Sequence, residues 1–111
     1  MIDDTLIQQL GDELFAALQS KTSLTPLTER YPDLTIEQAY QISLQFLKRR
    51  EAAGEKLIGK KIGVTSKAVQ DMLNVHQPDF GFLTDAMQVA DASSVSKAQY
   101  GLVQPRAEGE I

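Results

Sequence analysis

The feature that most constrains the fold is a switch at Gly54 in the spacing of apolar residues, from a helical period to short runs broken by glycine. Upstream, apolar residues recur at every fourth position from Ile2 to Leu18, which is the spacing of one face of an α-helix. The sequence therefore predicts an amphipathic helix over residues 3–20. Gly11 falls inside it and should weaken it by about 1 kcal/mol relative to alanine, unless another element packs closely there.

A second helix is predicted over residues 35–53. It begins with Thr35 followed three residues later by Gln38, the spacing of a capping box in which each side chain bonds the backbone of the other. Basic residues near its end complement the negative pole of the helix, and Gly54 suits the left-handed residue that stops it. Residues 21–34 contain two prolines and several threonines and predict a connecting loop.

Beyond Gly54 the sequence predicts shorter elements. Residues 56–65 are rich in β-branched residues and glycine and predict a strand, in which Gly59 and Gly63 mark bends or close approaches. Ser66 is then expected to cap a short helix that continues to Leu73.

Two further segments complete the prediction. The stretch from Pro78 to Gly81 predicts a turn. Residues 100–111 predict another strand, interrupted by Pro105, because proline cannot donate a backbone hydrogen bond.

Composition narrows the class of protein. A length of 111 residues with 42% hydrophobic content fits one small domain, and the absence of cysteine excludes disulfides and thiolate metal sites. The start lacks the features of a signal peptide, and no apolar stretch is long enough to span a bilayer, so a cytoplasmic protein is expected. The net charge is −4, and the basic stretch 48–67 has no interleaved aromatic residues, which argues against nucleic-acid binding.

Two glutamates near the end of the chain, Glu108 and Glu110, form a candidate metal site. If this segment is extended, side chains two residues apart lie on the same face, so both carboxylates could bind one cation. Oxygen ligands favour Mg²⁺ or Mn²⁺ over zinc. The alternative is an ordinary solvent-exposed pair, which is the commoner meaning of this spacing taken alone.

One of two adjacent lysines, an aspartate and a histidine could also contribute chemistry. Lys60 and Lys61 are adjacent, so on a strand they point to opposite faces, and the inward one would lie beside Gly63, where a lysine can donate a proton or hold an anion. Asp79 follows a proline and is first of all a turn former. His76 is a possible base, but a lone histidine in a loop is more often a surface residue. Dinucleotide, phosphate-loop and serine-hydrolase motifs are absent.

The same segments carry a family resemblance. The stretches Ile58–Gln70, Val75–Gly81 and Gln104–Ile111, in this order, resemble the 2-hydroxypenta-2,4-dienoate hydratases, also called 2-keto-4-pentenoate or vinylpyruvate hydratases. This family is grouped with the 4-oxalocrotonate decarboxylases in the fumarylacetoacetate-hydrolase-like fold. The resemblance implies an α+β architecture in which residues 1–54 are helical and 55–111 are mixed, leading into a β-roll. Since family members are longer, the chain is expected to correspond to their N-terminal portion.

The resemblance also implies roles for particular residues. It assigns Glu108 and Glu110 as ligands of Mg²⁺ or Mn²⁺, Lys61 as an active-site residue, and Asp79 as an acid, base or orienting group. It gives no firm role to His76 or Lys60.

The implied activity is metal-assisted addition of water to a small dienoic acid, giving 4-hydroxy-2-oxopentanoate in the meta-cleavage catabolism of aromatic compounds. A homo-oligomer and association with 4-oxalocrotonate decarboxylase are implied as well. Two alternatives stay open: decarboxylation on the same scaffold, and a chain of 111 residues that is inactive by itself and serves only as a structural or interface piece.

Overall fold

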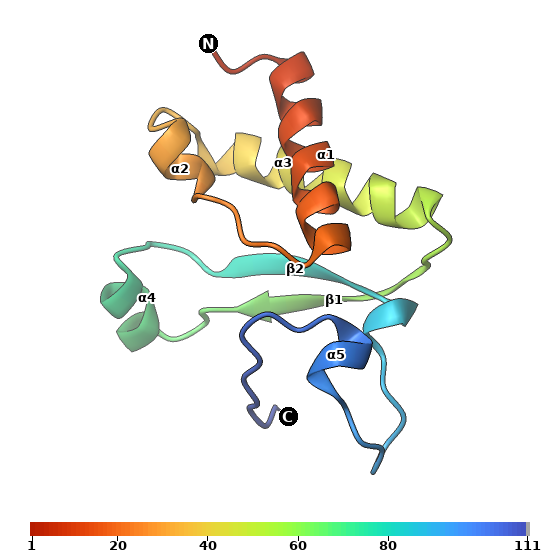
Figure 1. The fold of residues 1–111 in the computed structure, drawn as a ribbon. Coiled ribbons are helices and arrows are strands. Elements are labelled where there is room, and N and C mark those ends of the chain that lie inside the picture. Colours follow the sequence, from red (N-terminus) through yellow and green to blue (C-terminus); the bar gives the residue numbers. More distant parts are fainter. Residues whose placement is uncertain (111) are drawn as a thin grey trace. The chain divides into compact units, whose positions relative to one another are not determined.

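A computed structural model describes residues 1–110 and divides the chain into two compact units. The first contains Met1–Arg50 and the described part of Val89–Ile111, and the second contains Glu51–Gln88. The elements are mixed helices and a two-stranded sheet (Figure 1). The predicted α+β class is thereby confirmed.

The first unit is built on two crossed helices, α1 (Asp4–Ser20) and α3 (Ile36–Ala52) (Figure 1). Both agree with the predicted helices. Asp3 caps α1 by accepting a hydrogen bond from the Leu6 amide, and the predicted capping box opens α3. The Thr35 amide donates to Gln38 Oε1 at 3.0 Å, and the Gln38 amide donates to Thr35 Oγ1 at 3.1 Å.

The core of this unit lies where the two helices meet. Its buried residues are Ile7 and Leu10 from α1 and Ile42 from α3. Gly11 is also buried, and a Cβ at this position would lie only 2.5 Å from Cβ and Cγ of Gln45. Close packing of α3 therefore explains why a glycine occupies the middle of α1, as the sequence allowed.

The segment predicted as a loop over residues 21–34 contains a short helix, α2 (Leu27–Arg30). Leu27 and Tyr31 are partly buried against the core, and Arg30 forms a two-point ion pair with Glu13 of α1 at 2.6 and 3.0 Å. The loop prediction is wrong over these four residues. Proline and threonine are local signals, whereas α2 is held by contacts with a distant part of the chain.

Two carboxylates on α1 are stabilised in their ionised form by neighbours. A hydrogen bond from Gln45, followed by the hydrogen bond and charge of Arg49, lowers the pKa of Asp12. The hydrogen bond from Arg30 lowers the pKa of Glu13.

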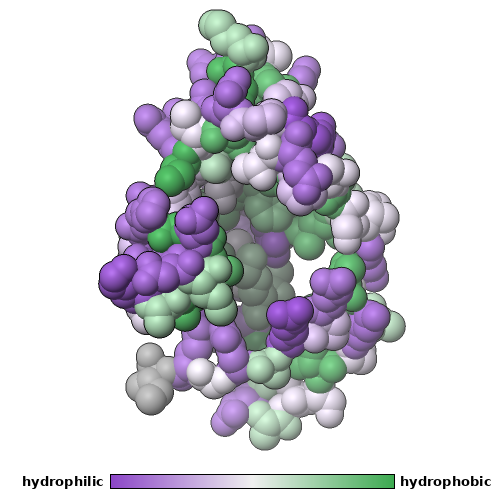
Figure 2. All heavy atoms as spheres, turned by 90° about the vertical axis from the view of Figure 1, so that its left-hand side faces the viewer, coloured by the Kyte–Doolittle hydropathy of each residue, from purple (hydrophilic) through white to green (hydrophobic). Residues whose placement is uncertain are grey.

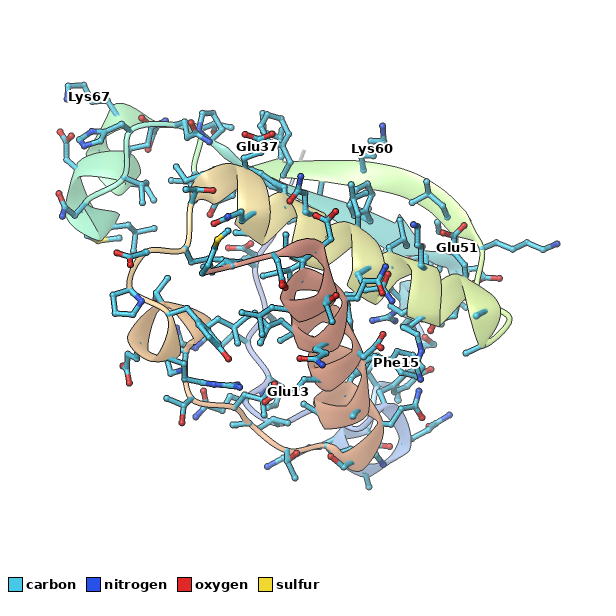
Figure 3. The ribbon with its side chains drawn as sticks, turned by 90° about the horizontal axis from the view of Figure 1, so that it is seen from above. Glu13, Phe15, Glu37, Glu51, Lys60 and Lys67 are labelled. Atoms are coloured by element: carbon cyan, nitrogen blue, oxygen red, sulfur yellow. The ribbon has the colours of Figure 1, made fainter. Side chains whose placement is uncertain are left out.

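Arg49 also lies over the ring of Phe15, 4.9 Å from its centroid. In Figure 3, Glu13 and Phe15 point to opposite sides of α1.

These shifts predict a loss of stability in acid. Because the folded-state pKa values of Asp12 and Glu13 are depressed, their contribution is fully present above about pH 4, the unfolded value, and is lost as pH falls through the folded values. Thermal unfolding of the double variant Asp12→Asn, Glu13→Gln should therefore show a smaller decrease in Tm between pH 5 and pH 3 than the wild-type protein shows. Equal decreases in the two proteins would contradict this assignment. Both pairs are solvent-exposed, so the effect should be small and should weaken with salt.

The second unit is a hairpin of two antiparallel strands, β1 (Leu57–Gly63) and β2 (Asp79–Thr84), joined through α4 (Lys67–Leu73). Ser66 caps α4 by accepting a hydrogen bond from the Val69 amide at 3.2 Å, as predicted. An irregularity between Leu57 and Gly59 interrupts the pairing near one end.

The prediction of a turn from Pro78 to Gly81 is wrong, because β2 begins at Asp79. Pro78 lies immediately before the strand, where no ladder hydrogen bond is required of it. Phe80 and Phe82 favour extended backbone. A proline-aspartate pair is a local turn signal, and the pairing with β1 overrides it.

The prediction of a strand over residues 100–111 is also wrong for the described part. Tyr100 ends a short helix, α5 (Lys97–Tyr100), which Ser96 caps by accepting from the Gln99 amide at 3.1 Å. Gly101 follows with φ 66°, and residues 102–110 form neither helix nor strand. No strand within residues 1–110 pairs with this segment, so no ladder hydrogen bonds from the described residues support a strand here. Ile111 lies outside the described residues.

The surface carries exposed apolar side chains among polar ones, as Figure 2 shows for one face. They include Ile62 and Phe80, which are paired across the hairpin and are 51% and 59% exposed. Among the helices described for residues 1–110, none has the length and apolar character that crossing a membrane requires.

Candidate functional site

The hairpin brings two of the predicted site residues together on one face. Lys61 on β1 is paired with Gly81, and Asp79 on β2 is paired with Gly63. Paired residues share a face of an antiparallel sheet, as do residues two positions apart on one strand. Lys61 and Asp79 are therefore diagonal neighbours. The Cα atoms of such positions are typically roughly 7–8 Å apart.

The remaining two corners of this arrangement are glycines. We call the four positions Lys61, Gly63, Asp79 and Gly81 the Lys–Asp square. A Cβ added at Gly63 or Gly81 would meet no other described atom within 4 Å. Lys61 and Asp79 are both exposed.

Lys60 belongs to the opposite face, as predicted from its adjacency to Lys61. It is paired with Phe82 and shares that face with Ile62 and Phe80. Figure 3 shows its side chain extending away from β1. The structure thus separates the two lysines, and only Lys61 accompanies Asp79.

Polar contacts fasten the end of the hairpin away from the square. The Asp85 amide donates to the carbonyl of Lys56 at 2.9 Å, and the Lys56 amide donates to Asp85 Oδ1 at 2.9 Å. The hydroxyl of Thr84, which is fully buried, donates to Glu55 Oε1. Together these bonds fix the register of β1 against β2 and hence the positions of Lys61 and Asp79.

The predicted metal ligands Glu108 and Glu110 lie in the irregular segment that follows α5, and both are exposed. Their convergence on one cation was expected if this segment is extended, and the segment is not paired into a sheet within residues 1–110. Among residues 1–110, no third acidic or histidine side chain joins them in a ligand cluster.

The donor chemistry of Glu108 and Glu110 nevertheless fits a hard divalent cation. Two carboxylates separated by one glycine supply only oxygen ligands, and Mg²⁺ commonly uses one or two carboxylates together with water and substrate oxygens. The pair is thus a chemically suitable but partial ligand set.

Sequence reasoning missed Gly81 as part of the site. Its role depends on the partner it faces across the hairpin, and the predicted turn concealed the strand to which it belongs. The usable signal was the alternation of aromatic residues at positions 80 and 82, which is typical of a strand.

Comparisons with known proteins identify the family. No protein-family model matches the chain. The chain is 60% identical over all 111 residues to a 2-hydroxyhexa-2,4-dienoate hydratase of Comamonas testosteroni. It is 60% identical over 110 residues to a 2-hydroxypent-2,4-dienoate hydratase of Pseudomonas putida. These matches span 42% and 49% of the two relatives, so the chain covers less than half their length.

Related decarboxylases share the fold. The chain is 38% identical over 85 residues to a 4-oxalocrotonate decarboxylase of Pseudomonas sp. (strain CF600), with 77% of the chain and 31% of the relative covered. A solved 4-oxalocrotonate decarboxylase of Pseudomonas putida G7, complexed with magnesium and adipate, matches with a TM-score of 0.72 and 28% identity. That match covers 77% of this chain and 32% of the other.

The fold is therefore the α+β, fumarylacetoacetate-hydrolase-like fold of these lyases. Within it, the chain belongs to the family of the 2-hydroxypenta-2,4-dienoate hydratases.

Proposed function

We propose that the complete protein adds water to 2-hydroxypenta-2,4-dienoate or a close homologue, giving 4-hydroxy-2-oxopentanoate in the five-carbon case. The observation that carries the proposal is the 60% identity, over essentially the whole chain, to two relatives named as dienoate hydratases. The decisive assay follows the absorbance of freshly prepared dienoate with the complete gene product. No decay above the buffer rate would overturn the proposal.

The chemistry requires several proton movements. A proton leaves the C2 hydroxyl and one is added at C5, which gives the conjugated 2-oxo-3-enoate. The oxygen of water then bonds to C4, and a proton is added at C3, so that one water is consumed overall. A site for this reaction needs a cationic group near the developing negative charge on the C2 oxygen and a group that orients or deprotonates water.

The Lys–Asp square supplies groups of these kinds. We propose that the Lys61 ammonium stabilises the anionic oxygen or relays its proton, and that the Asp79 carboxylate orients the attacking water. Their shared face on the hairpin supports this division of roles, because both can then reach one bound molecule.

We also propose that Glu108 and Glu110 bind Mg²⁺ or Mn²⁺, completed by ligands outside the described residues. Such a cation would supply Lewis-acid polarisation of the bound oxo acid. Support comes from the donor chemistry of the pair and from structures of the related decarboxylase complexed with magnesium or with calcium. By itself, the 111-residue chain should bind the cation weakly and lack activity.

Substitution of Lys61 tests its role against a matched control. Lys61→Met in the complete enzyme should lower kcat for hydration by about 100-fold, the scale expected for a group that acts in proton transfer. Lys60→Met removes the same charge from the opposite face and should leave kcat within about twofold, since surface changes away from a site are usually mild. Equal rates for the two variants would remove Lys61 from the mechanism.

A second candidate function is decarboxylation of 4-oxalocrotonate. It is favoured by the likeness in sequence and structure to the decarboxylases. The higher identity to the hydratases makes it the less supported choice. Release of CO₂ from 4-oxalocrotonate without hydration of the dienoate would reverse this order.

We infer that the complete protein is a cytoplasmic homo-oligomer whose residues 1–54 form a helical part and whose residues from 55 onward lead into a β-roll. We also infer that it associates with 4-oxalocrotonate decarboxylase. These inferences rest on the family resemblance. Light scattering of the complete protein, alone and mixed with the decarboxylase, measures both assemblies.

A further inference from the structure

The Lys–Asp square contains two glycines that neither a positive φ angle nor a close contact explains. In the described chain, Gly54 and Gly101 adopt positive φ angles of 103° and 66°, and Gly11 is needed for close packing. Gly63 and Gly81 have neither reason. Their φ angles are not positive, and a Cβ at either position would enter open space.

Glycine at such positions carries an energetic cost. Within a strand it destabilises by roughly 0.5–1 kcal/mol relative to alanine, because the unfolded chain is more flexible and no side chain packs. A glycine in the interior of a strand often marks a place where a ligand or another backbone approaches closely. Gly81 lies inside β2 and faces Lys61 across the hairpin, and Gly63 is the last residue of β1 and faces Asp79. A group that approaches both glycines therefore lies between the two charged side chains.

The shape of this surface suits a flat acid. With no side chain at Gly63 or Gly81, the strand backbone forms a bare strip bounded at opposite corners by an ammonium and a carboxylate group. A conjugated dienoate is planar, so it could lie flat on this strip with its anionic end toward Lys61.

We propose that Gly63 and Gly81 form a side-chain-free floor for the planar substrate and determine its affinity. This inference deepens the proposed function and rests on it for the identity of the substrate. A methyl group at either glycine would hold the ligand away from the backbone and move its reacting carbons relative to Lys61 and Asp79. We propose that the substrate occupies the surface over Gly63 and Gly81. The alternative is that another segment of the protein covers it.

The test compares three alanine variants of the complete enzyme. Gly63→Ala and Gly81→Ala place a methyl group inside the square. Gly59→Ala places the same group on the same face of β1 but outside the square, beside Leu83, whose Cδ1 would lie at an ordinary 3.8 Å. We expect at least a tenfold increase in KM for the first two variants and less than a twofold change for Gly59→Ala, with similar thermal unfolding for all three.

A binding measurement separates this inference from the proposed activity. Sorbate, a planar and unreactive hexadienoate, serves as the calorimetric probe with Mg²⁺ present. Gly81→Ala should weaken sorbate binding at least tenfold, and Gly59→Ala should not. Suppose that the wild-type enzyme binds sorbate, that Gly81→Ala weakens this binding while Gly59→Ala does not, and that the wild-type enzyme does not hydrate the dienoate. The glycine floor is then supported and the proposed function is wrong.

Three results would overturn the floor. One is unchanged KM and unchanged sorbate affinity in both Gly63→Ala and Gly81→Ala. The second is a large decrease in Tm with unchanged KM, which would mean that another segment of the protein occupies the strip. The third is a wild-type enzyme that does not bind sorbate.

Discussion

Glu108→Gln or Glu110→Gln should lower kcat/KM of the complete enzyme for dienoate hydration by about 1,000-fold, equivalent to the several kcal/mol that a Lewis-acid cation contributes. Glutamine keeps the size of each side chain and one oxygen ligand but removes the negative charge that binds a hard cation. Calorimetric titration with Mg²⁺ and with Mn²⁺ should show the corresponding loss of affinity. If the substitution weakens metal binding without abolishing it, excess metal should partly restore activity.

A matched control is available on α3. Glu37 is also exposed and lies in the first turn of that helix, so Glu37→Gln makes the same chemical change away from the proposed ligands. It should retain normal metal affinity and rate. If Glu108→Gln and Glu110→Gln behave like this control at limiting metal, the two glutamates do not bind the cation and the metal assignment is wrong.

Gly11→Val should destabilise the protein by about 3 kcal/mol, at the upper end of the cost of overpacking a filled core. The Cβ would lie 2.5 Å from Cβ and Cγ of Gln45 and 3.0 Å from the carbonyl oxygen of Ile42, so the helices must separate to admit it. Gly11→Ala should destabilise less, because alanine recovers about 1 kcal/mol of helix propensity and adds only one carbon. Urea or thermal unfolding measures both changes.

A double-mutant cycle identifies the cause. Gln45→Gly removes the two carbons that the new Cβ would meet, although it also removes the hydrogen bond to Asp12 and weakens α3. If the clash is responsible, Gly11→Ala and Gln45→Gly together should destabilise less than the sum of the single variants, by 1 kcal/mol or more. Strict additivity would show that Gly11 is not the close contact between α1 and α3.

Much of the fold followed from local patterns. Residues 3–20 and 35–53 carry their own apolar stripes and capping side chains, and the helices found there begin and end within a residue or so of these limits. Ser66 likewise predicts the start of α4, which it caps. Such signals act over a few residues, so they can be recognised from the sequence alone.

The predictions of secondary structure were wrong where contacts between distant parts of the chain determine the structure. The short helix α2 depends on Glu13 and on the core, and β2 depends on β1. The segment after Tyr100 lacks a strand partner among the described residues, and the predicted strand is not formed there. For α2 and β2, proline and threonine gave a local indication of a loop or turn that long-range contacts overrode.

By itself, the sequence determined the two long helices, the first strand and, through its motifs, the family and the identities of the candidate residues. Only the tertiary structure decided that Lys61 and Asp79 share one face with two glycines between them. The physical reason is that strand register is set by hydrogen bonds between segments about twenty residues apart, and a shift of one residue would reverse every side chain. Helical periodicity needs no such partner.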